Sequence, residues 1–179
     1  MDYLKALHEN PNLAKEFDSL FDFLLLDKLS PRDEAEGRVT FTLPGMAFAR
    51  DGSGGEYHLL EDGSIGYYSS EGEAGRLAES MDDLFSLIVN CICWKDCCDA
   101  KEYGDSKTLE DYGQNQRNIN LEDIDSWQRV ADTLGISTDE PLAPVLERFR
   151  KATLRQPQYQ CIFHEDDGSL TKSYGLMFE

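Results

Sequence analysis

The fold of this chain is decided by residues 45–85, GMAFARDGSGGEYHLLEDGSIGYYSSEGEAGRLAESMDDLF. Apolar and polar side chains alternate in its short segments, which is the period of half-buried strands. The segment 51–55 is rich in glycine and 61–64 reads Glu-Asp-Gly-Ser, and these residues favour tight turns. The stretch therefore predicts antiparallel strands at 46–50, 56–60 and 65–69, joined by a loop and a hairpin turn.

A helix is predicted directly after these strands. Ser80 stands before two aspartates and an apolar run that starts at Leu84. A serine hydroxyl caps the first turn of a helix, and acidic side chains there complement the helix dipole. We expect a helix from about 81 to 95. The apolar face of the strands that it would cover comprises Met46, Phe48, Tyr57, Leu59, Ile65 and Tyr67.

The flanking segments add helices and a second hairpin. Residues 2–29 have a helical period, 38–43 alternate as a strand, and 96–120 are polar and irregular, which predicts a long loop. Further helices are expected from Asn120 to Gly135 and from Thr138 to about 153, followed by a hairpin over 159–164 and 170–178. This order predicts an α+β fold, with a mostly antiparallel twisted sheet and helices packed on one side.

Three parts of the chain follow from this pattern. Residues 1–95 form the predicted core of helix, sheet and helix, and 96–120 form a polar insertion loop. Residues 121–179 form a helical hairpin plus a C-terminal β-hairpin, expected to pack on the same domain.

Charge is the outlying property of the composition. The chain has 35 acidic and 17 basic residues, a net charge of −18, and 18 acidic against five basic residues lie within 51–125. Such a field attracts cationic partners and disfavours nucleic acids and anionic membranes, which bind clustered Lys and Arg. We expect a basic protein partner; the alternative is an acidic surface that only aids solubility.

The sequence also predicts the compartment. No signal peptide is visible at the N-terminus, and no run approaches the roughly 20 apolar residues of a membrane span. The five cysteines are an odd number, and four of them lie within 91–98, which is no disulfide framework of a secreted protein. We expect a reduced, cytoplasmic protein that does not bind membranes.

The cysteines at 91, 93, 97 and 98 admit three interpretations: a zinc site, a redox pair or ordinary cysteines on a helix face. On the predicted helix Cys91 and Cys93 point about 200° apart, so both cannot reach one metal ion. We expect no metal and no disulfide required for folding. Stoichiometric zinc, lost together with structure on chelation, would contradict this.

Other chemical sites are not indicated. The loop 51–55 lacks the lysine of a phosphate-binding loop and leads into a strand rather than a helix. His8, His58 and His164 are scattered, and none stands in a catalytic motif. The paired carboxylates of the chain lie on predicted turns, which do not bury them as a catalytic dyad requires. We expect no catalytic residues and no cofactor.

The ordered motifs resemble those of the SUKH superfamily, which includes yeast cell-wall-assembly regulators and many bacterial immunity proteins. They are Gly45-x-x-Phe48, DGSGGEY-x-LL at 51–60, Gly63-x-Ile65, SEGE at 70–73 and AES-x-x-DLF-x-LI at 78–88. The resemblance covers residues 43–90, and neither 96–120 nor 159–178 has a counterpart. It implies an early helix, a twisted antiparallel sheet and helices on one side.

In bacterial members, the resemblance implies neutralisation of a cognate polymorphic toxin, often a nuclease, by direct binding. An acidic inhibitor is steered rapidly onto such a basic surface and screens its active site. We therefore expect a toxin-immunity protein that acts by occlusion and is not an enzyme. The alternative is an intracellular regulatory adaptor of the same fold, and a third class is an enzyme or metal protein built on the cysteines.

The binding surface is expected on the acidic turns, because turns project from a rigid sheet and vary without disturbing the core. Aromatic anchors dominate interface energies, and Tyr68 is out of phase with the core residue Tyr67, which predicts its exposure. The candidate contacts are Asp51, Glu56, Glu61, Asp62, Tyr68, Glu71 and Glu73.

Overall fold

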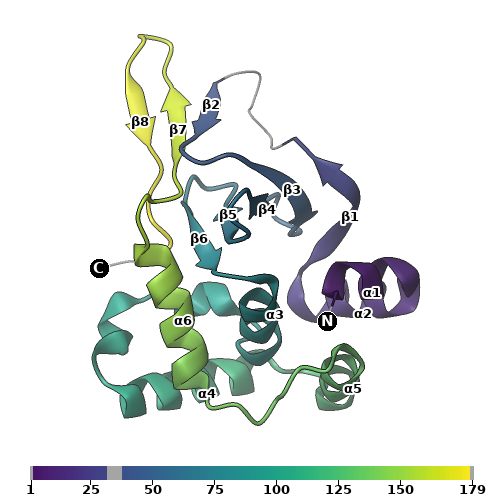
Figure 1. The fold of residues 1–179 in the computed structure, drawn as a ribbon. Helices are drawn as coiled ribbons and strands as arrows, with labels where there is room; N and C mark the ends of the chain where they lie inside the picture. The colour runs from purple at the N-terminus through teal and green to yellow at the C-terminus, as the bar shows by residue number, and fades with distance from the viewer. Residues whose placement is uncertain (1, 32–37, 178–179) are drawn as a thin grey trace.

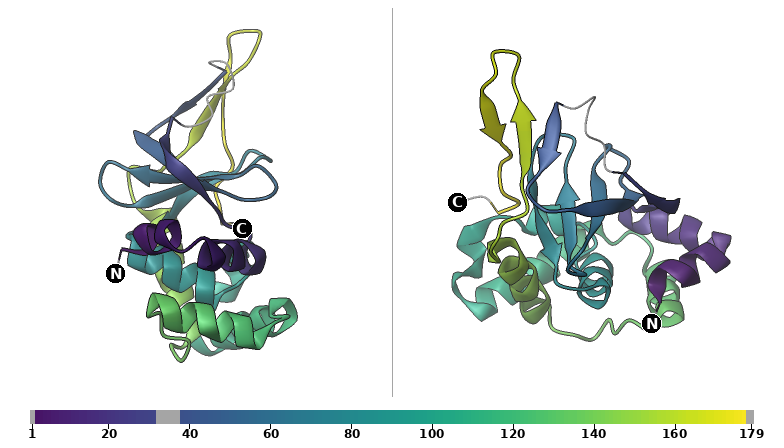
Figure 2. Two further views of the ribbon diagram at one scale, coloured as in Figure 1. Left: turned by 90° about the vertical axis from the view of Figure 1, so that its right-hand side faces the viewer. Right: turned by 45° about the horizontal axis from the view of Figure 1, so that its top comes forward.

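The computed structural model describes residues 2–31 and 38–177 and has the predicted α+β fold. A five-stranded antiparallel sheet lies in the middle of the molecule. Helices cover one of its faces, and a separate three-stranded sheet rises from the other (Figures 1 and 2). Helices on one side of a mostly antiparallel sheet are therefore confirmed. No helix within the described ranges is long and apolar enough to cross a bilayer.

The five-stranded sheet contains the predicted strands in a simple meander. Its order is β1-β3-β4-β5-β6, so strands adjacent in the chain pair with one another, except that β2 (Val39–Phe41) belongs to the other sheet. The register places Glu56 opposite Tyr68 and Met46 opposite Leu59. The strands are β1 (Leu24–Ser30), β3 (Gly45–Arg50), β4 (Glu56–Leu60), β5 (Ile65–Tyr68) and β6 (Ala74–Ala78).

The N-terminal segment corrects one prediction, because residues 2–29 are not helical throughout. They form α1 (Tyr3–Glu9), α2 (Pro11–Phe21) and then strand β1. Helix α2 ends at Asp22, which takes the left-handed conformation with φ of 51°. The following leucine-rich segment pairs with β3, so sheet hydrogen bonds override the local preference of leucine for helix.

Helix α3 (Met81–Asn90) begins where predicted, with the Ser80 hydroxyl accepting the Asp83 N–H at 3.1 Å. It ends five residues earlier than expected. The Arg117 guanidinium donates to the backbone oxygen of Asn90, and the Trp127 indole donates to that of Val89. Side chains from distant residues thus satisfy the carbonyl groups of Val89 and Asn90, and the helix ends at Asn90. A short 3₁₀ helix, η2 (Trp94–Cys97), follows.

The segment 96–120 is not a loop, which corrects a second prediction. It contains η3 (Ala100–Gly104) and the 15-residue helix α4 (Ser106–Asn120). The residues that α4 buries lie four positions apart, at Leu109, Gly113 and Arg117. Gly113 lets α4 approach helix α6 (Leu142–Leu154) closely, since a Cβ there would lie 3.0 Å from Leu142. Such a narrow stripe on an otherwise polar helix gives little signal in the sequence.

The C-terminal half follows the prediction more closely. Helix α5 (Ile124–Leu134) ends at Gly135, which has φ of 65°, but its cap is Asp123 rather than Asn120. Helix α6 (Leu142–Leu154) begins after Pro141, later than expected. The predicted hairpin forms β7 (Cys161–His164) and β8 (Leu170–Lys172), and β7 pairs with β2 (Val39–Phe41) to give the three-stranded sheet.

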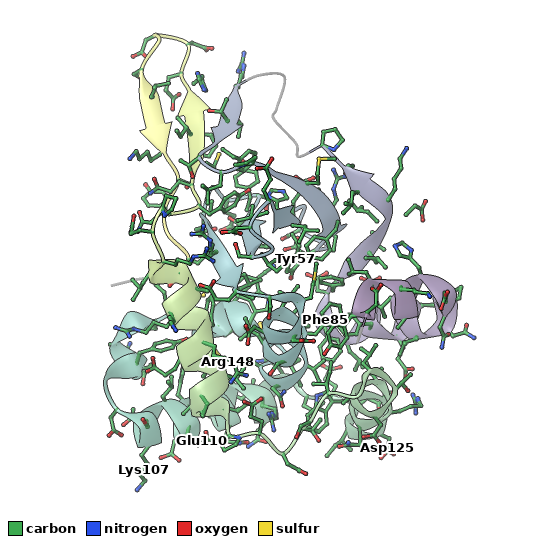
Figure 3. All side chains as sticks on the ribbon, viewed as in Figure 1. Tyr57, Phe85, Lys107, Glu110, Asp125 and Arg148 are labelled. Carbon is green, nitrogen blue, oxygen red and sulfur yellow. The ribbon has the colours of Figure 1, made fainter. Side chains whose placement is uncertain are left out.

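Two apolar clusters hold these layers together. The main core lies between the helices and the sheet, where Tyr57 and Phe85 come from opposite layers (Figure 3). A smaller cluster between the two sheets contains Tyr159 and Cys161. Four of the six predicted core-face residues are buried, but Leu59 is half-buried and Met46 is exposed. The register shifts between Ala47 and Ala49, and this bulge breaks the alternation that the prediction assumed.

Candidate partner-binding site at the acidic turns

The predicted contact residues lie in three places on the sheet. Because the strands run antiparallel, the loop 51–55 and the β5–β6 turn lie at one end, which we call the acidic end. The β4–β5 turn lies at the other, which we call the arginine end after Arg76 and Arg155 beside it. Glu56 and Tyr68 pair at the strand ends next to the acidic end, on the face toward the small sheet.

A cavity of about 220 Å³ opens at the acidic end. We call it the turn pocket. The β5–β6 turn contributes serines and the predicted contacts Glu71 and Glu73. Segment η2 contributes the Trp94 ring and the Lys95 ammonium group, which the sequence analysis did not predict at the site. The turn pocket is lined by Ser53, Tyr67, Ser69, Ser70, Glu71, Glu73, Trp94, Lys95, Cys98 and Leu176.

Asp51 hydrogen-bonds residues that line the turn pocket and is itself buried, so the prediction of Asp51 as an exposed partner contact is wrong. Its carboxylate accepts hydrogen bonds from Lys95 at 2.6 Å, Tyr67 at 2.5 Å and the Gly55 N–H at 2.7 Å. Burial by itself would raise the pKa of Asp51, but these donors and Ser53 outweigh it and lower the pKa to about 2. Burial of the Tyr67 hydroxyl, its hydrogen bond to Asp51 and the Asp51 charge raise the pKa of Tyr67.

The β5–β6 turn presents Glu71 and Glu73 on a fixed backbone. The Ser69 hydroxyl accepts the N–H groups of both residues, at 3.2 and 3.0 Å, and hydrogen-bonds the Glu73 carboxylate. Gly72 has φ of 93°, a conformation that side chains disfavour. Glu71 is exposed, and no ion pair to either glutamate occurs among the described residues. The ammonium group of Lys95, which lines the same cavity, is paired with Asp51.

The prediction of Glu56 as a partner contact is also wrong, because Glu56 is buried between the two sheets. Its carboxylate pairs with Arg50 at 2.7 Å and with His58 Nε2 at 2.9 Å, and His58 Nδ1 hydrogen-bonds the Tyr159 hydroxyl. Glu56 and His58 are two residues apart in a strand, so their side chains lie on the same face. This spacing could have predicted their hydrogen bond from the sequence. The third member comes from 101 residues away. The His58 side chain has no exposed surface, whereas that of Arg50, which pairs with Glu56, is 46% exposed.

Tyr68 is out of phase with Tyr67, yet it is not exposed as predicted. Its ring packs edge-on against Phe41 with centroids 5.5 Å apart, and its hydroxyl hydrogen-bonds the Cys161 thiol. Both partners belong to the small sheet, which the alternation of a single strand could not reveal. Tyr68 is therefore half-buried, and it is not available as a free-standing anchor.

At the arginine end, Asp62 is neutralised within the chain. It pairs with Arg155 at 2.8 Å and with buried Arg76 at 3.2 Å. Burial acts to raise the pKa of Asp62, but hydrogen bonds from Ser64 and the charges of the two arginines outweigh it and lower the pKa. Glu61 is exposed beside it, and its carboxylate has no described partner.

The cysteines do not share one helix face, which corrects that interpretation; Cys91, Cys97 and Cys98 are buried and Cys93 is half-buried. Cys91 caps α3 and Cys97 lies in η2, with Cys93 between the two helices. Burial raises the pKa of Cys93 to about 11 and those of Cys97 and Cys98 to about 12, so these thiols stay protonated at neutral pH. In the described ranges no three His, Cys, Asp or Glu side chains are placed to hold a metal ion.

Comparisons with protein-family models, with curated proteins and with solved structures found no match. The site is therefore interpreted from its own geometry.

Proposed function

We propose that this chain is a toxin-immunity protein that binds a basic toxin domain and neutralises it by occlusion in the cytoplasm. One observation carries the proposal. At the acidic end, Glu71 and Glu73 stand on a rigid turn beside a cavity whose only lysine is already paired with Asp51. Carboxylates left without a cation in a chain of net charge −18 favour a partner that supplies the cation.

A role in binding without catalysis is supported by the chemistry of the other groups. Burial raises the pKa values of the cysteine thiols, and Glu56, His58 and Tyr159 are buried between the sheets. The polar groups of the turn pocket are carboxylates, hydroxyls and one paired ammonium. The SUKH resemblance adds the same expectation for the class of partner, and a nuclease is the basic toxin that fits it best.

The test is protection. We expect a toxin domain to be encoded next to this gene, and its absence there would count against the proposal. That domain is expressed in a bacterial host with and without this chain, and we expect growth only in the presence of the chain. Purified chain should bind the same domain in a one-to-one complex and block its activity. Binding without protection would contradict the immunity role and favour a regulatory adaptor. Neither binding nor protection would refute the proposal as a whole.

A further inference from the structure

A second concave surface adjoins the turn pocket on the far side of Trp94 and Lys95. Two cavities of about 320 and 210 Å³ lie next to one another here, and both are lined by the end of α2, by Ile92 and by Asn120. We call their union the α2 groove. It runs from Lys95, which also lines the turn pocket, to the start of α5 at Ser126. The α2 and α5 helices that border it lie near one another in both views of Figure 2.

The lining of the groove mixes polar and apolar side chains, and its apolar part is only partly covered. Leu20, Ile92 and Leu121 are half-buried and belong to the margin of the main core. The Trp94 indole closes the end nearest the turn pocket, and it donates to the Tyr57 hydroxyl at 3.4 Å. A partner side chain placed here would cover apolar surface that this chain leaves open to water.

The rim of the groove is acidic. Three of its carboxylates already have partners: Glu16 pairs with Arg129, Asp22 accepts the Gly52 N–H, and Asp123 caps α5. Asp18 and Glu122 remain, and no hydrogen bond or ion pair to either carboxylate occurs among the described residues. The lysine that lines the groove is neutralised by Asp51.

From this combination we infer that the α2 groove binds an extended, basic segment of the partner protein. Lysine or arginine side chains of that segment pair with Asp18 and Glu122, and an apolar side chain lies on Leu20 and Ile92. Charge decides the occupant: an acidic segment would meet unpaired carboxylates, and a purely apolar one would leave them without a cation. The inference rests on the proposed function for the identity of the partner, although the groove itself is testable without it.

The test uses the synthetic hexapeptide KLKRLK and the whole chain labelled with ¹⁵N. The chain has two tryptophans. Trp94 lines the groove, whereas Trp127 is buried and donates to Val89, so its indole signal is an internal control. We expect KLKRLK to shift the Trp94 indole signal and leave that of Trp127 unchanged. The acidic peptide ELEDLE should not bind, and KGKRGK, which lacks the apolar side chains, should bind at least about tenfold more weakly.

The matched variants remove the same charge at two places. Asp18→Asn with Glu122→Gln should weaken KLKRLK binding by about tenfold or more. Glu165→Gln with Asp166→Asn, on the exposed turn between β7 and β8, should change it less than about twofold. Equal binding to both variants, equal binding of KGKRGK, or an unmoved Trp94 signal would each overturn the inference.

The toxin domain separates failure of the groove from failure of the proposed function. If the Asp18→Asn, Glu122→Gln variant loses the peptide but binds the toxin domain as tightly as the unaltered chain, the groove does not serve that partner, and the immunity role stands. If the peptide binds at the groove and the chain gives no protection, the immunity role falls, and the groove remains a site for another basic segment.

Discussion

The β5–β6 turn and the β4–β5 turn stand at opposite ends of one sheet and carry the same kinds of side chain. Each presents two carboxylates on a glycine-containing turn, Glu71 and Glu73 at one end and Glu61 and Asp62 at the other. At the arginine end, Asp62 lies between two guanidinium groups. At the acidic end no guanidinium from the described residues pairs with either glutamate.

This difference comes from the segments that pack beside each turn. Arg155 follows helix α6, and its backbone oxygen accepts from Arg76, so the arginine end is tied to the C-terminal half of the chain. The acidic end borders η2, whose one lysine is used by Asp51. Neighbours in space therefore determine whether a turn carboxylate is paired within the chain or available to a partner. The residue type of the carboxylate does not determine this.

The largest effect should come from Arg76→Met. Arg76 is buried and donates to the Ser64 hydroxyl at 3.0 Å, to the Pro157 oxygen at 2.5 Å and to Asp62. Its loss leaves buried acceptors unsatisfied, and we expect the free energy of unfolding to fall by about 3 kcal/mol. Urea unfolding measures this. The control is Arg150→Met, which breaks an exposed pair with Glu147 and should cost less than about 0.5 kcal/mol; equal losses would refute the structural role of the arginine end.

Asp51→Asn should come next, with a loss of about 2 kcal/mol at neutral pH, because a buried carboxylate that accepts five hydrogen bonds loses its charge. The pKa of Asp51 falls on folding from 3.8 to about 2, so its contribution is fully present above about pH 4 and is lost as the pH falls through about 2. The stability gap between the two proteins should therefore be constant at neutral pH and narrow between about pH 4 and 2. Thermal unfolding across this pH range measures the stability difference between the two proteins. A difference that widens as the pH falls would contradict the prediction.

Reversal of both glutamates, Glu71→Lys with Glu73→Lys, should alter binding far more than stability. We expect association with the toxin domain to slow by about tenfold at low ionic strength and to depend less on salt. The free energy of unfolding should change by less than about 1 kcal/mol, mainly through the lost hydrogen bond to Ser69. Stopped-flow association measures the rate. Glu165→Lys with Asp166→Lys changes the net charge equally elsewhere, so equal slowing there would mean that overall charge alone steers the encounter.

The smallest effect is expected from Glu61→Lys at the arginine end. The side chain is exposed and without a described partner, so stability should change by less than about 0.5 kcal/mol. Association should stay within about twofold of the unaltered rate, because the nearby arginines already offset the charge of this end. A decrease as large as that of the Glu71, Glu73 reversal would move the binding surface to this end of the sheet.

The parts of the fold that could be predicted depend on residues a few positions apart. The strands β4 and β5 with their antiparallel pairing, the turn at Gly63 and the cap at Ser80 were all confirmed. The predictions that were wrong concern segments whose secondary structure depends on contacts with residues far away in the sequence. Strand β1 is a leucine-rich run fixed by pairing with β3, and α4 is a polar helix fixed by the close approach of Gly113 to Leu142.

For the candidate site, the sequence by itself determined the residue types: an acidic excess, carboxylates on tight turns and the period that separates Tyr67 from Tyr68. Only the tertiary structure decided which carboxylates are exposed. Asp51 meets Lys95 across 44 residues and Asp62 meets Arg155 across 93. Turn and strand preferences act between near neighbours, whereas a cation that neutralises a carboxylate can come from anywhere in the chain, and only the packed fold brings the two together.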